Sequence, residues 1–130
     1  MDEEAKCTFQ KDAFYISHTA DRMGYRLNGK ALKTHMVPSL LSSGVSFGTV
    51  QLLPDGQLII LMADHQTTGG YPKIANVISA HLPLLAQMNP GQAIKFQFTE
   101  LEMAEQQAAD QYNYLQHLQN ACKLKLQKLL

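Results

Sequence analysis

The segment QLLPDGQLIILMA, residues 51–63, carries the clearest structural signal in the chain. Proline, aspartate and glycine in succession are typical of a tight turn, because they supply a fixed φ, a side chain that caps the turn and a residue that tolerates positive φ. We therefore predict a hairpin whose strands are residues 45–53 and 58–63. The second strand is almost entirely apolar, as expected of a strand that is covered on both faces.

Shorter strands are predicted on either side of this hairpin. Residues 13–17 are rich in aromatic and β-branched side chains, and residues 25–27 lead into an Asn-Gly turn. Apolar and polar residues alternate over residues 94–99, which is typical of a half-buried strand. These segments extend the hairpin into a larger β structure.

Two helices are predicted after the hairpin. Pro72 suits a first helical position, where its missing N–H costs nothing, and Pro83 should end or bend this helix. Its apolar residues recur at helical spacing: Ile74, Val77, Ile78 and Leu82. From Glu102 onward, one apolar stripe without glycine or proline indicates a long amphipathic helix, with acids near its start and lysines near its end. Ordinary docking of this helix is preferred over a coiled coil, because the stripe is short and rich in glutamine.

Composition limits the size and class of the protein. The chain has 130 residues, of which 45% are hydrophobic and 17% charged, and this is enough for one globular domain with its own core. We expect a mainly β protein with minor α content. Its β body would span residues 1–100 with one or two internal helices. A C-terminal helix over residues 101–130 would pack on that body or extend from it.

Charge and cysteine usage argue against several functions. Eleven basic residues balance eleven acidic ones, so neither nucleic acid nor a membrane surface is expected as a partner. The longest purely apolar run, residues 58–63, is too short to cross a bilayer, and the acidic N-terminus predicts no secretory signal. Cys7 and Cys122 are far apart, so no disulfide and no metal site is expected, and the histidines are equally scattered. The histidines are His18, His35, His65, His81 and His117. The expectation that follows is a reduced, cytoplasmic protein.

The segment ADHQTTGGYPK, residues 63–73, is the most informative candidate site. Its paired glycines allow a ligand to approach the backbone, and free N–H groups at the predicted helix start suit a carboxylate, a phosphate or a developing oxyanion. Asp64 can act as a base or hold a substrate N–H, while Gln66, Thr67 and Thr68 can hold a planar amide. The same residues can also serve only to cap a turn, and the pattern leaves both interpretations open.

Two other segments hold polar candidates. Arg22 and Arg26 are four residues apart, so in an extended segment they share one face and can offer guanidinium groups to a carboxylate or phosphate in one cleft. Solvated arginines on a sheet surface are the simpler interpretation. Ser43 and Gln51 are candidate polar liners, although a loop followed by an edge strand is the preferred explanation of that segment. No nucleophile elbow, phosphate-binding loop or dinucleotide fingerprint occurs.

Together, these segments resemble the biotin-dependent carboxyltransferase family, whose members are also called allophanate hydrolase subunit 2 and the C subunit of 5-oxoprolinase. The resemblance rests on DRMGYRLNG (21–29), on SSGVSFGTVQLLPDGQ (42–57) and on LMADHQTTGGYPKIA (61–75). It runs from about Phe14 to Phe98 and implies a cyclophilin-like β-barrel. It also implies that the chain corresponds to a second subdomain, because family members carry a first subdomain that has no counterpart here.

The resemblance further implies an activity. In the family, this subunit works with a companion subunit and a third protein to open 5-oxoproline to glutamate with ATP, and related domains of urea carboxylase move a carboxyl group from biotin to urea. This chain would then contribute half of a cleft for a small-molecule amide substrate and would show no turnover by itself. No cofactor would be bound tightly, and ATP or biotin would act only in the full complex.

Site residues are also implied by the resemblance, position by position. The implied catalytic residues are Asp64 and Arg22. The implied substrate-binding residues are Arg26, Ser43, Gln51, Gln66, Thr67, Thr68, Gly69, Gly70 and Tyr71. No metal ligand is implied.

Other functions stay open at this point. Some family members were described as antagonists of a kinase inhibitor, so a regulatory protein-binding module is the main alternative. A peptidyl-prolyl isomerase is a weaker alternative, because it rests on the expected barrel alone. An exposed sheet edge or docking face would also allow the chain to form homo-oligomers.

Overall fold

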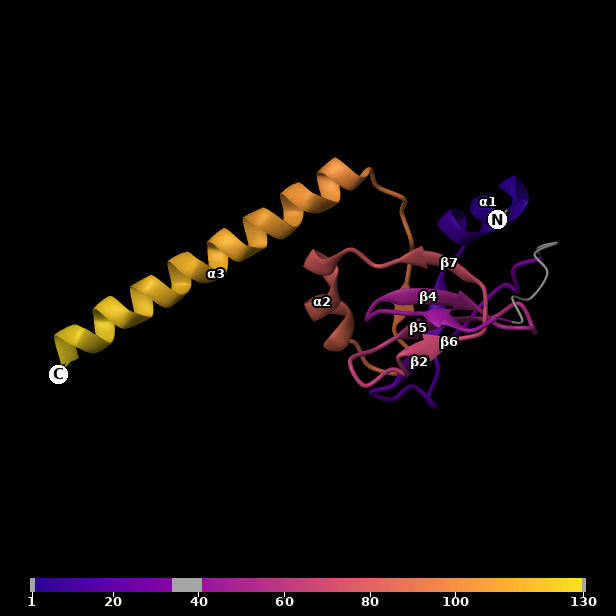
Figure 1. Ribbon diagram of the computed structural model, residues 1–130, viewed down its shortest axis with the longest axis horizontal. Coiled ribbons are helices and arrows are strands. Elements are labelled where there is room, and N and C mark those ends of the chain that lie inside the picture. Colours follow the sequence, from indigo (N-terminus) through magenta and orange to yellow (C-terminus); the bar gives the residue numbers. More distant parts are fainter. Residues whose placement is uncertain (1, 34–40, 130) are drawn as a thin grey trace. The chain divides into compact units, whose positions relative to one another are not determined.

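The computed structural model describes residues 2–33 and 41–129 (Figure 1). The described chain divides into two units. The first is a β body that contains the residues up to Phe98 except residues 78–80. The second is a helical unit made of residues 78–80 and the chain from Thr99 onward.

A six-stranded antiparallel sheet forms the β body, with the strand order β7-β4-β5-β2-β1-β8. Its strands are β1 (Phe14–Ile16), β2 (Gly24–Asn28), β4 (Thr49–Leu52), β5 (Leu58–Leu61), β7 (Lys73–Asn76) and β8 (Ala93–Ile94). A separate two-stranded ribbon consists of β3 (Ser43–Gly44) and β6 (Thr68–Gly69). The predicted mainly β class is confirmed. The strand pairings of the described residues give an open sheet with β7 and β8 at its edges, and not the closed barrel that was expected.

The predicted hairpin is present as strands β4 and β5, which pair antiparallel. Gly56 adopts φ +80°, a conformation that favours glycine. Leu53 N donates to Gln57 O at 2.8 Å, and Gln57 N donates to the Asp55 Oδ1 atom at 3.0 Å. The turn therefore forms as its proline, aspartate and glycine predict.

The first strand of this hairpin is shorter than predicted. Gly48 adopts φ +88°, which breaks the extended backbone, and Thr49 N donates to Ser46 O at 3.0 Å across a turn. The expected strand over residues 45–53 is therefore replaced by β4, which begins at Thr49. The residues of β3 precede this turn and pair with β6 instead.

The helix predicted from Pro72 is wrong. The residues that follow this proline form β7, which pairs with β4 in the sheet. Helical structure begins only at a 3₁₀ turn, Ser79–His81, and continues in α2 (Leu82–Ala86), where Pro83 lies in the first turn instead of ending a helix. The segment forms a strand because the edge of β4 supplies hydrogen-bond partners for the backbone groups of β7, and because β-branched isoleucine favours a strand over a helix.

Helix α1 (Glu3–Lys11) was not predicted, although it supplies part of the core. Its Ala5 and Phe9 are each 2% exposed, and the Phe9 ring stacks on Phe96 with centroids 4.3 Å apart. Two apolar residues four positions apart are consistent with a helix, but they are too few to establish a period. The acids in its first turn and the lysine in its last match the helix dipole.

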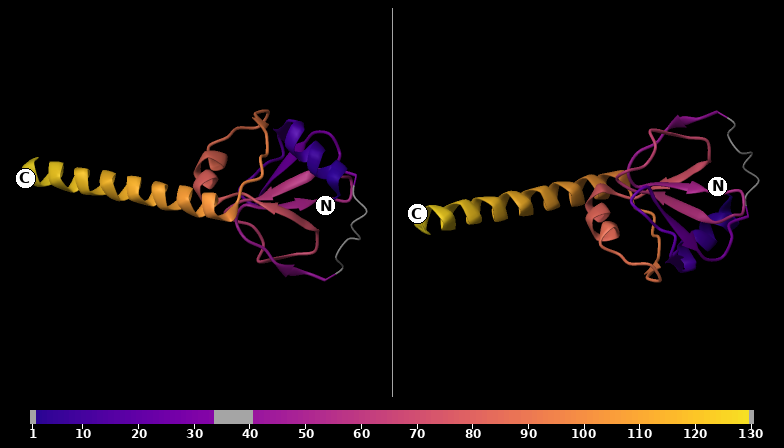
Figure 2. Two further views of the ribbon diagram at one scale, coloured as in Figure 1. Left: turned by 90° about the horizontal axis from the view of Figure 1, so that it is seen from above. Right: turned by 90° about the horizontal axis from the view of Figure 1, so that it is seen from below.

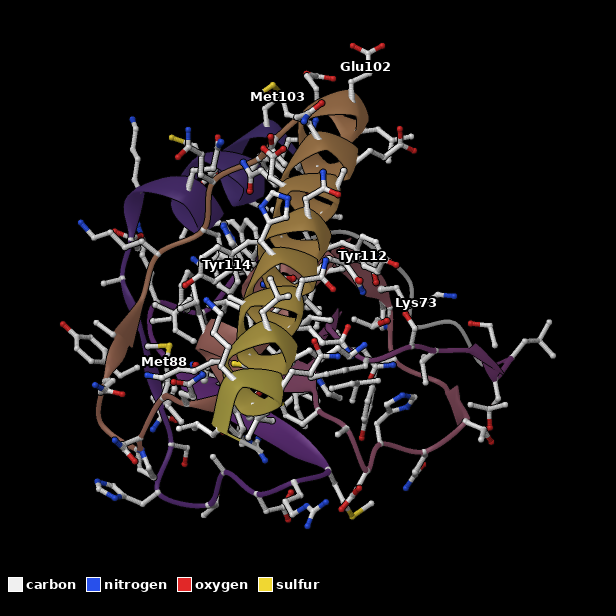
Figure 3. All side chains as sticks on the ribbon, turned by 90° about the vertical axis from the view of Figure 1, so that its left-hand side faces the viewer. Lys73, Met88, Glu102, Met103, Tyr112 and Tyr114 are labelled. Carbon is white, nitrogen blue, oxygen red and sulfur yellow. The ribbon has the colours of Figure 1, made fainter. Side chains whose placement is uncertain are left out.

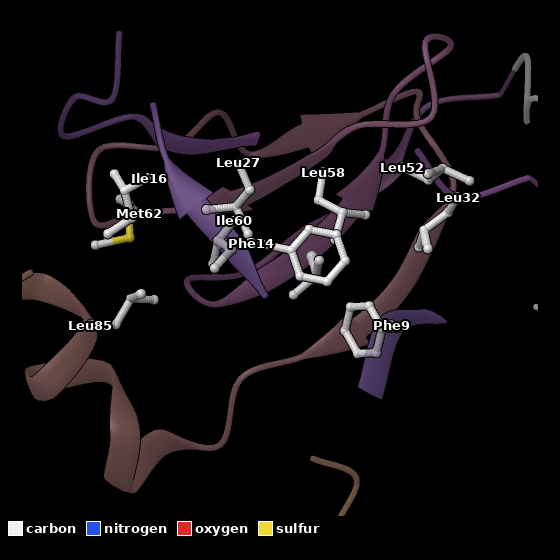
Figure 4. Close-up of a cluster of buried hydrophobic side chains, with 11 residues drawn as sticks. Phe9, Phe14, Ile16, Leu27, Leu32, Leu52, Leu58, Ile60, Met62 and Leu85 are labelled. Atoms are coloured by element: carbon white, nitrogen blue, oxygen red, sulfur yellow. The ribbon is translucent and has the colours of Figure 1, made fainter. Parts of the chain in front are cut away.

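Buried side chains of the sheet and of its adjoining loops gather with Phe9 of α1 and Leu85 of α2 to form the core of the β body (Figure 4). The buried core residues are Phe9, Phe14, Ile16, Leu27, Leu32, Val50, Leu52, Leu58, Ile60, Met62 and Leu85. Although β8 ends at Ile94, Phe96 also packs against this core. The predicted alternation of core-facing and exposed side chains therefore extends past Ile94, where the hydrogen-bonded strand ends.

Helix α3 (Leu101–Leu129) forms most of the helical unit, and Figure 2 shows it as one continuous helix. The predicted long C-terminal helix is confirmed. None of its described residues is buried. Within this unit, Gln111 Nε2 donates to Ala80 O at 3.1 Å. No helix in the described ranges is long and apolar enough to cross a membrane.

Candidate carboxyltransferase site

Backbone pairing beyond the regular ends of β2 and β5 brings Arg22 and Asp64 together. Met62 N donates to Met23 O at 3.0 Å, and Asp64 N donates to Arg22 O at 2.9 Å. The Nε atom of Arg22 then lies 2.9 Å from the Oδ2 atom of Asp64. The register of two strands thus places the two expected catalytic residues in direct contact.

Asp21 holds the backbone that carries Arg22. Its Oδ1 atom accepts hydrogen bonds from Met23 N at 2.8 Å and from Gly24 N at 3.1 Å. Such an Asx-type turn restricts the bend that leads into β2. A Cβ atom at Gly24 would lie 2.8 Å from Ile59 Cδ1, so the Ile59 side chain packs over this glycine.

The Arg22–Asp64 pair is open to solvent. The two side chains are 82% and 52% exposed. An ion pair this exposed contributes about 0–1 kcal/mol to stability, because water screens the attraction. The same pair would interact much more strongly with each other and with a ligand if another surface covered it.

A hollow of about 360 Å³ lies beside Arg22 in the β body. Asp21 and Arg22 are its charged lining residues, and most of the other lining side chains are apolar, among them Phe47, Met62 and Met88. Ligand pockets usually have volumes of about 300–1,000 Å³ and a mostly apolar lining. The size and lining of this hollow therefore suit a small molecule.

A second group of expected site residues lies at the ribbon and on β4. Ser43 pairs with Gly69 in the ribbon, and Gln51 on β4 is only 4% exposed. Among the residues with a described placement, the Gln51 Nε2 atom has no hydrogen-bond partner. A Cβ atom at Gly69 would lie 2.5 Å from this nitrogen, so the absence of a side chain lets the ribbon pack on the amide. A buried donor without a partner costs about 1–3 kcal/mol, which makes Gln51 a candidate for binding a ligand oxygen.

Arg26 does not join the Arg22–Asp64 pair. Its Nη2 atom lies 2.8 Å from the Oδ2 atom of Asp55, in the turn between β4 and β5. The backbone N–H of Gln57, followed by the Arg26 guanidinium, lowers the pKa of the Asp55 carboxyl below its ordinary value. The two arginines that were expected to share a cleft therefore contact different carboxylates at opposite ends of β2.

Comparison with known proteins identifies the family. A model of the carboxyltransferase domain, subdomain A and B, matches residues 1–98. The chain belongs to this family. It is 50% identical over 94 residues to the 5-oxoprolinase C subunit of Haemophilus influenzae and 43% identical over 118 residues to that of Escherichia coli. These matches cover 72% and 91% of this chain but only 30% and 38% of the relatives, so the chain spans about a third of their length.

A solved structure agrees with this assignment. The crystal structure of the Kluyveromyces lactis urea carboxylase matches with a TM-score of 0.74 and 25% sequence identity. The match covers 81% of this chain and 10% of that chain. The carboxyltransferase family inferred from the motifs is thereby confirmed.

The loop that precedes β7 in this carboxyltransferase domain lies at the surface. Gln66, Thr67 and Thr68 are exposed, Gly69 and Gly70 are half-buried, and Tyr71 is exposed. Because β7 follows this loop, the paired glycines do not lead into a helix. The helix start that was expected after these glycines is therefore wrong.

Several polar residues near the ribbon were not singled out from the sequence. Lys73, labelled in Figure 3, donates from Nζ to Gly44 O at 3.0 Å. Thr49, which is 1% exposed, donates from Oγ1 to Asn76 Oδ1 at 3.0 Å and accepts a hydrogen bond from Ser46 N. The Lys73 and Asn76 bonds join residues that are 29 and 27 positions apart, so no local pattern signals them.

The residue types that bind metals are dispersed over the part of the chain that the structure describes. Within residues 2–33 and 41–129, no group of three or more His, Cys, Asp or Glu side chains could hold a metal ion. His35, one of the scattered histidines, lies outside the described residues. Cys7 and Cys122 are exposed free cysteines.

Proposed function

We propose that this chain supplies one wall of the catalytic cleft of a 5-oxoprolinase, which opens 5-oxoproline to glutamate with ATP together with a companion subunit. Two relatives, both named as the C subunit of 5-oxoprolinase, support this choice of substrate at 50% and 43% identity. The observation that carries the proposal at the level of residues is the Arg22–Asp64 contact beside the hollow.

The chemistry of the substrate fits an adjacent donor and acceptor. A cyclic amide is held in the cis form, so its N–H and its C=O lie on the same edge of the ring. Asp64 would accept a hydrogen bond from the N–H, and Arg22 would donate to the oxygen. Each partner has capacity left, because a carboxylate has a second oxygen and a guanidinium has further N–H groups. As a nucleophile adds to the carbonyl carbon, negative charge grows on the amide oxygen, and the nearby guanidinium stabilises it. The ring opens in the next step, when this charge returns to the carbonyl and the C–N bond breaks, with the nitrogen taking up a proton.

Gln51 would offer a separate donor near the ribbon, since it is not among the residues that line the hollow. Its buried amide nitrogen faces Gly69 without a hydrogen-bond partner among the residues placed by the structure. A ligand oxygen that reached this nitrogen would remove the free-energy cost of a buried, unpaired donor. Ligand binding would therefore also stabilise the surrounding structure. We assign no described residue to ATP or biotin, which would act in the full complex.

A second surface is required to complete the cleft. Chemistry at the Arg22–Asp64 pair needs water to be excluded, whereas these side chains are 82% and 52% exposed. The relatives are much longer than this chain, which covers 30% and 38% of them, so that surface would come from their remaining parts or from a companion subunit. We therefore expect the isolated chain to show no 5-oxoproline hydrolysis, and measurable turnover by it would refute this arrangement.

The test is a matched pair of substitutions in the complex reconstituted with its companion subunit, its third protein and ATP. Asp64→Asn should lower glutamate formation by about 100-fold or more, the size of effect found when one preorganised hydrogen-bonding group of a catalytic site is lost. Asp55→Asn makes the same change in the other Arg–Asp pair and should leave activity near that of the unmodified complex. Assembly, measured by co-purification, should survive both changes.

The outcomes separate the competing functions. If Asp64→Asn disrupts assembly and Asp55→Asn does not, the regulatory protein-binding module becomes the better explanation. Equal loss of activity in both variants would show that the assigned site is wrong, because the two aspartates would then act only through stability.

A further inference from the structure

The hollow beside Arg22 is larger than the ring of a small cyclic amide. Its volume of about 360 Å³ would hold about twelve water molecules, at about 30 Å³ for each. The Arg22–Asp64 contact lies at one side of it, since Arg22 belongs to both. An amide held by this pair would thus leave part of the hollow for additional atoms.

The lining indicates which atoms would fit. Ile16 and Met62 are 2% and 4% exposed, and Figure 4 shows them side by side, opposite α2. These two side chains form the floor of the hollow, and the half-buried Phe47 and Met88 supply apolar surface that a ligand can still cover. Apolar surface gains free energy when it is removed from water, and methionine side chains adjust their shape to different occupants. Hydrocarbon is therefore the favoured occupant of this part of the site.

We propose that this hollow binds the hydrocarbon part of a cyclic amide, while Arg22 and Asp64 hold the amide edge. The site then accepts cyclic amides that are larger and more apolar than 5-oxoproline. This inference rests on the proposed function for its use of the Arg22–Asp64 pair. Binding by the hollow itself can be measured without any turnover.

The experiment uses the 130-residue chain labelled at its methionine methyl groups and titrated with two lactams. Caprolactam, with two more methylene groups than 2-pyrrolidinone, should shift the signals of Met62 and Met88 and bind at least about tenfold more tightly, at about millimolar concentration. Met103 on α3, labelled in Figure 3 with Met88, is 55% exposed and serves as the control methionine. Its signal should not move.

Substitutions then test the hollow directly. Ala86→Leu places a larger side chain on a lining residue of the hollow and should weaken caprolactam more than 2-pyrrolidinone. The matched control, Ala109→Leu, makes the same change at an exposed position of α3 and should have no effect. Unchanged signals of Met62 and Met88, equal affinities for the two lactams or an equal shift of Met103 would overturn the proposal.

A last variant separates this inference from the proposed function. Asp64→Asn should weaken both lactams by a similar factor, because each loses the acceptor for its N–H. If the methionine signals still respond to caprolactam and Asp64→Asn leaves both affinities unchanged, the link between the hollow and the Arg22–Asp64 pair is overturned. If Asp64→Asn abolishes hydrolysis in the complex but no lactam moves the methionine signals, the hollow proposal alone is overturned.

Discussion

The β2–β5 pair carries an arginine and an aspartate in contact at each of its two ends, and the surroundings of these contacts differ. At the hairpin end, Arg26 lies 2.8 Å from Asp55, whose other carboxylate oxygen caps the turn. At the opposite end, Arg22 lies 2.9 Å from Asp64 beside an apolar hollow. The same two residue types thus contact a turn at one end and lie beside a hollow at the other, because their neighbours differ.

Two glutamines show the same contrast. Gln57, near the hairpin turn, accepts a hydrogen bond from Gly29 N at 3.1 Å and donates to Gly29 O at 3.2 Å. Gln51 is buried, and its amide nitrogen has no partner within the described residues. The Gln57 amide is satisfied by the protein itself, whereas the Gln51 nitrogen is not paired by the described residues.

The largest expected effect is the loss of activity caused by Arg22→Ala. We expect the reconstituted complex to lose about 100-fold in turnover, because charge on the amide oxygen would no longer be stabilised. The free energy of unfolding of the chain should change by less than about 1 kcal/mol, since the ion pair is exposed. Arg22→Lys should restore little activity, because lysine lacks the planar guanidinium. If Arg22→Ala lowered stability as strongly as it lowered activity, Arg22 would act through stability, and the two ends of the β2–β5 pair would not differ in role.

The next effect concerns the backbone of the hairpin end. Gly56 has φ +80°, and a Cβ atom there would lie 2.9 Å from Ala31 Cβ and 3.0 Å from Leu32 O. Gly56→Ala should therefore lower the free energy of unfolding by about 1–3 kcal/mol, measured by urea denaturation. Gly44→Ala in the ribbon is the control, because a Cβ there meets nothing within 4 Å, and it should change stability by less than about 0.5 kcal/mol. Equal losses of stability in Gly56→Ala and Gly44→Ala would contradict the prediction that the turn requires glycine at position 56.

A smaller effect, opposite in sign at the two glutamines, is expected for glutamine-to-leucine changes. Gln57→Leu removes two hydrogen bonds and should lower the free energy of unfolding by about 1–2 kcal/mol. Gln51→Leu removes an unpaired buried donor and should be neutral or stabilising by up to about 1 kcal/mol, while activity of the complex falls. Thermal unfolding and turnover measured on the same samples check both changes. A strongly destabilising Gln51→Leu would show that this amide already has a structural partner.

The smallest expected effect is the acid sensitivity of the hairpin. Hydrogen bonding to the Gln57 N–H, together with Arg26, lowers the pKa of Asp55 in the folded chain. Its contribution to stability is therefore present above the unfolded pKa and is lost as the pH falls through the folded pKa. Between neutral pH and about pH 3, the unmodified chain should lose slightly more stability than Asp55→Asn. Parallel stability curves for the two proteins would show that Asp55 makes no such contribution.

Local chemistry made part of the fold predictable. The proline, aspartate and glycine before Gln57 specify a turn within a few residues, and the long apolar period from Leu101 onward specifies a helix. The segment after Pro72 has apolar residues at helical spacing, yet it forms a strand because β4 lies beside it. Helix α1 depends on Phe9 meeting Phe96, a contact that no local pattern reveals.

The amino-acid sequence by itself determined the residue types of the candidate site and the motifs that mark the family. Only the tertiary structure decided that Arg22 meets Asp64, that Arg26 meets Asp55 and that Gln51 is buried against Gly69. The physical reason is that strand register depends on hydrogen bonds between segments far apart in the chain, and a change of register would exchange every one of these neighbours.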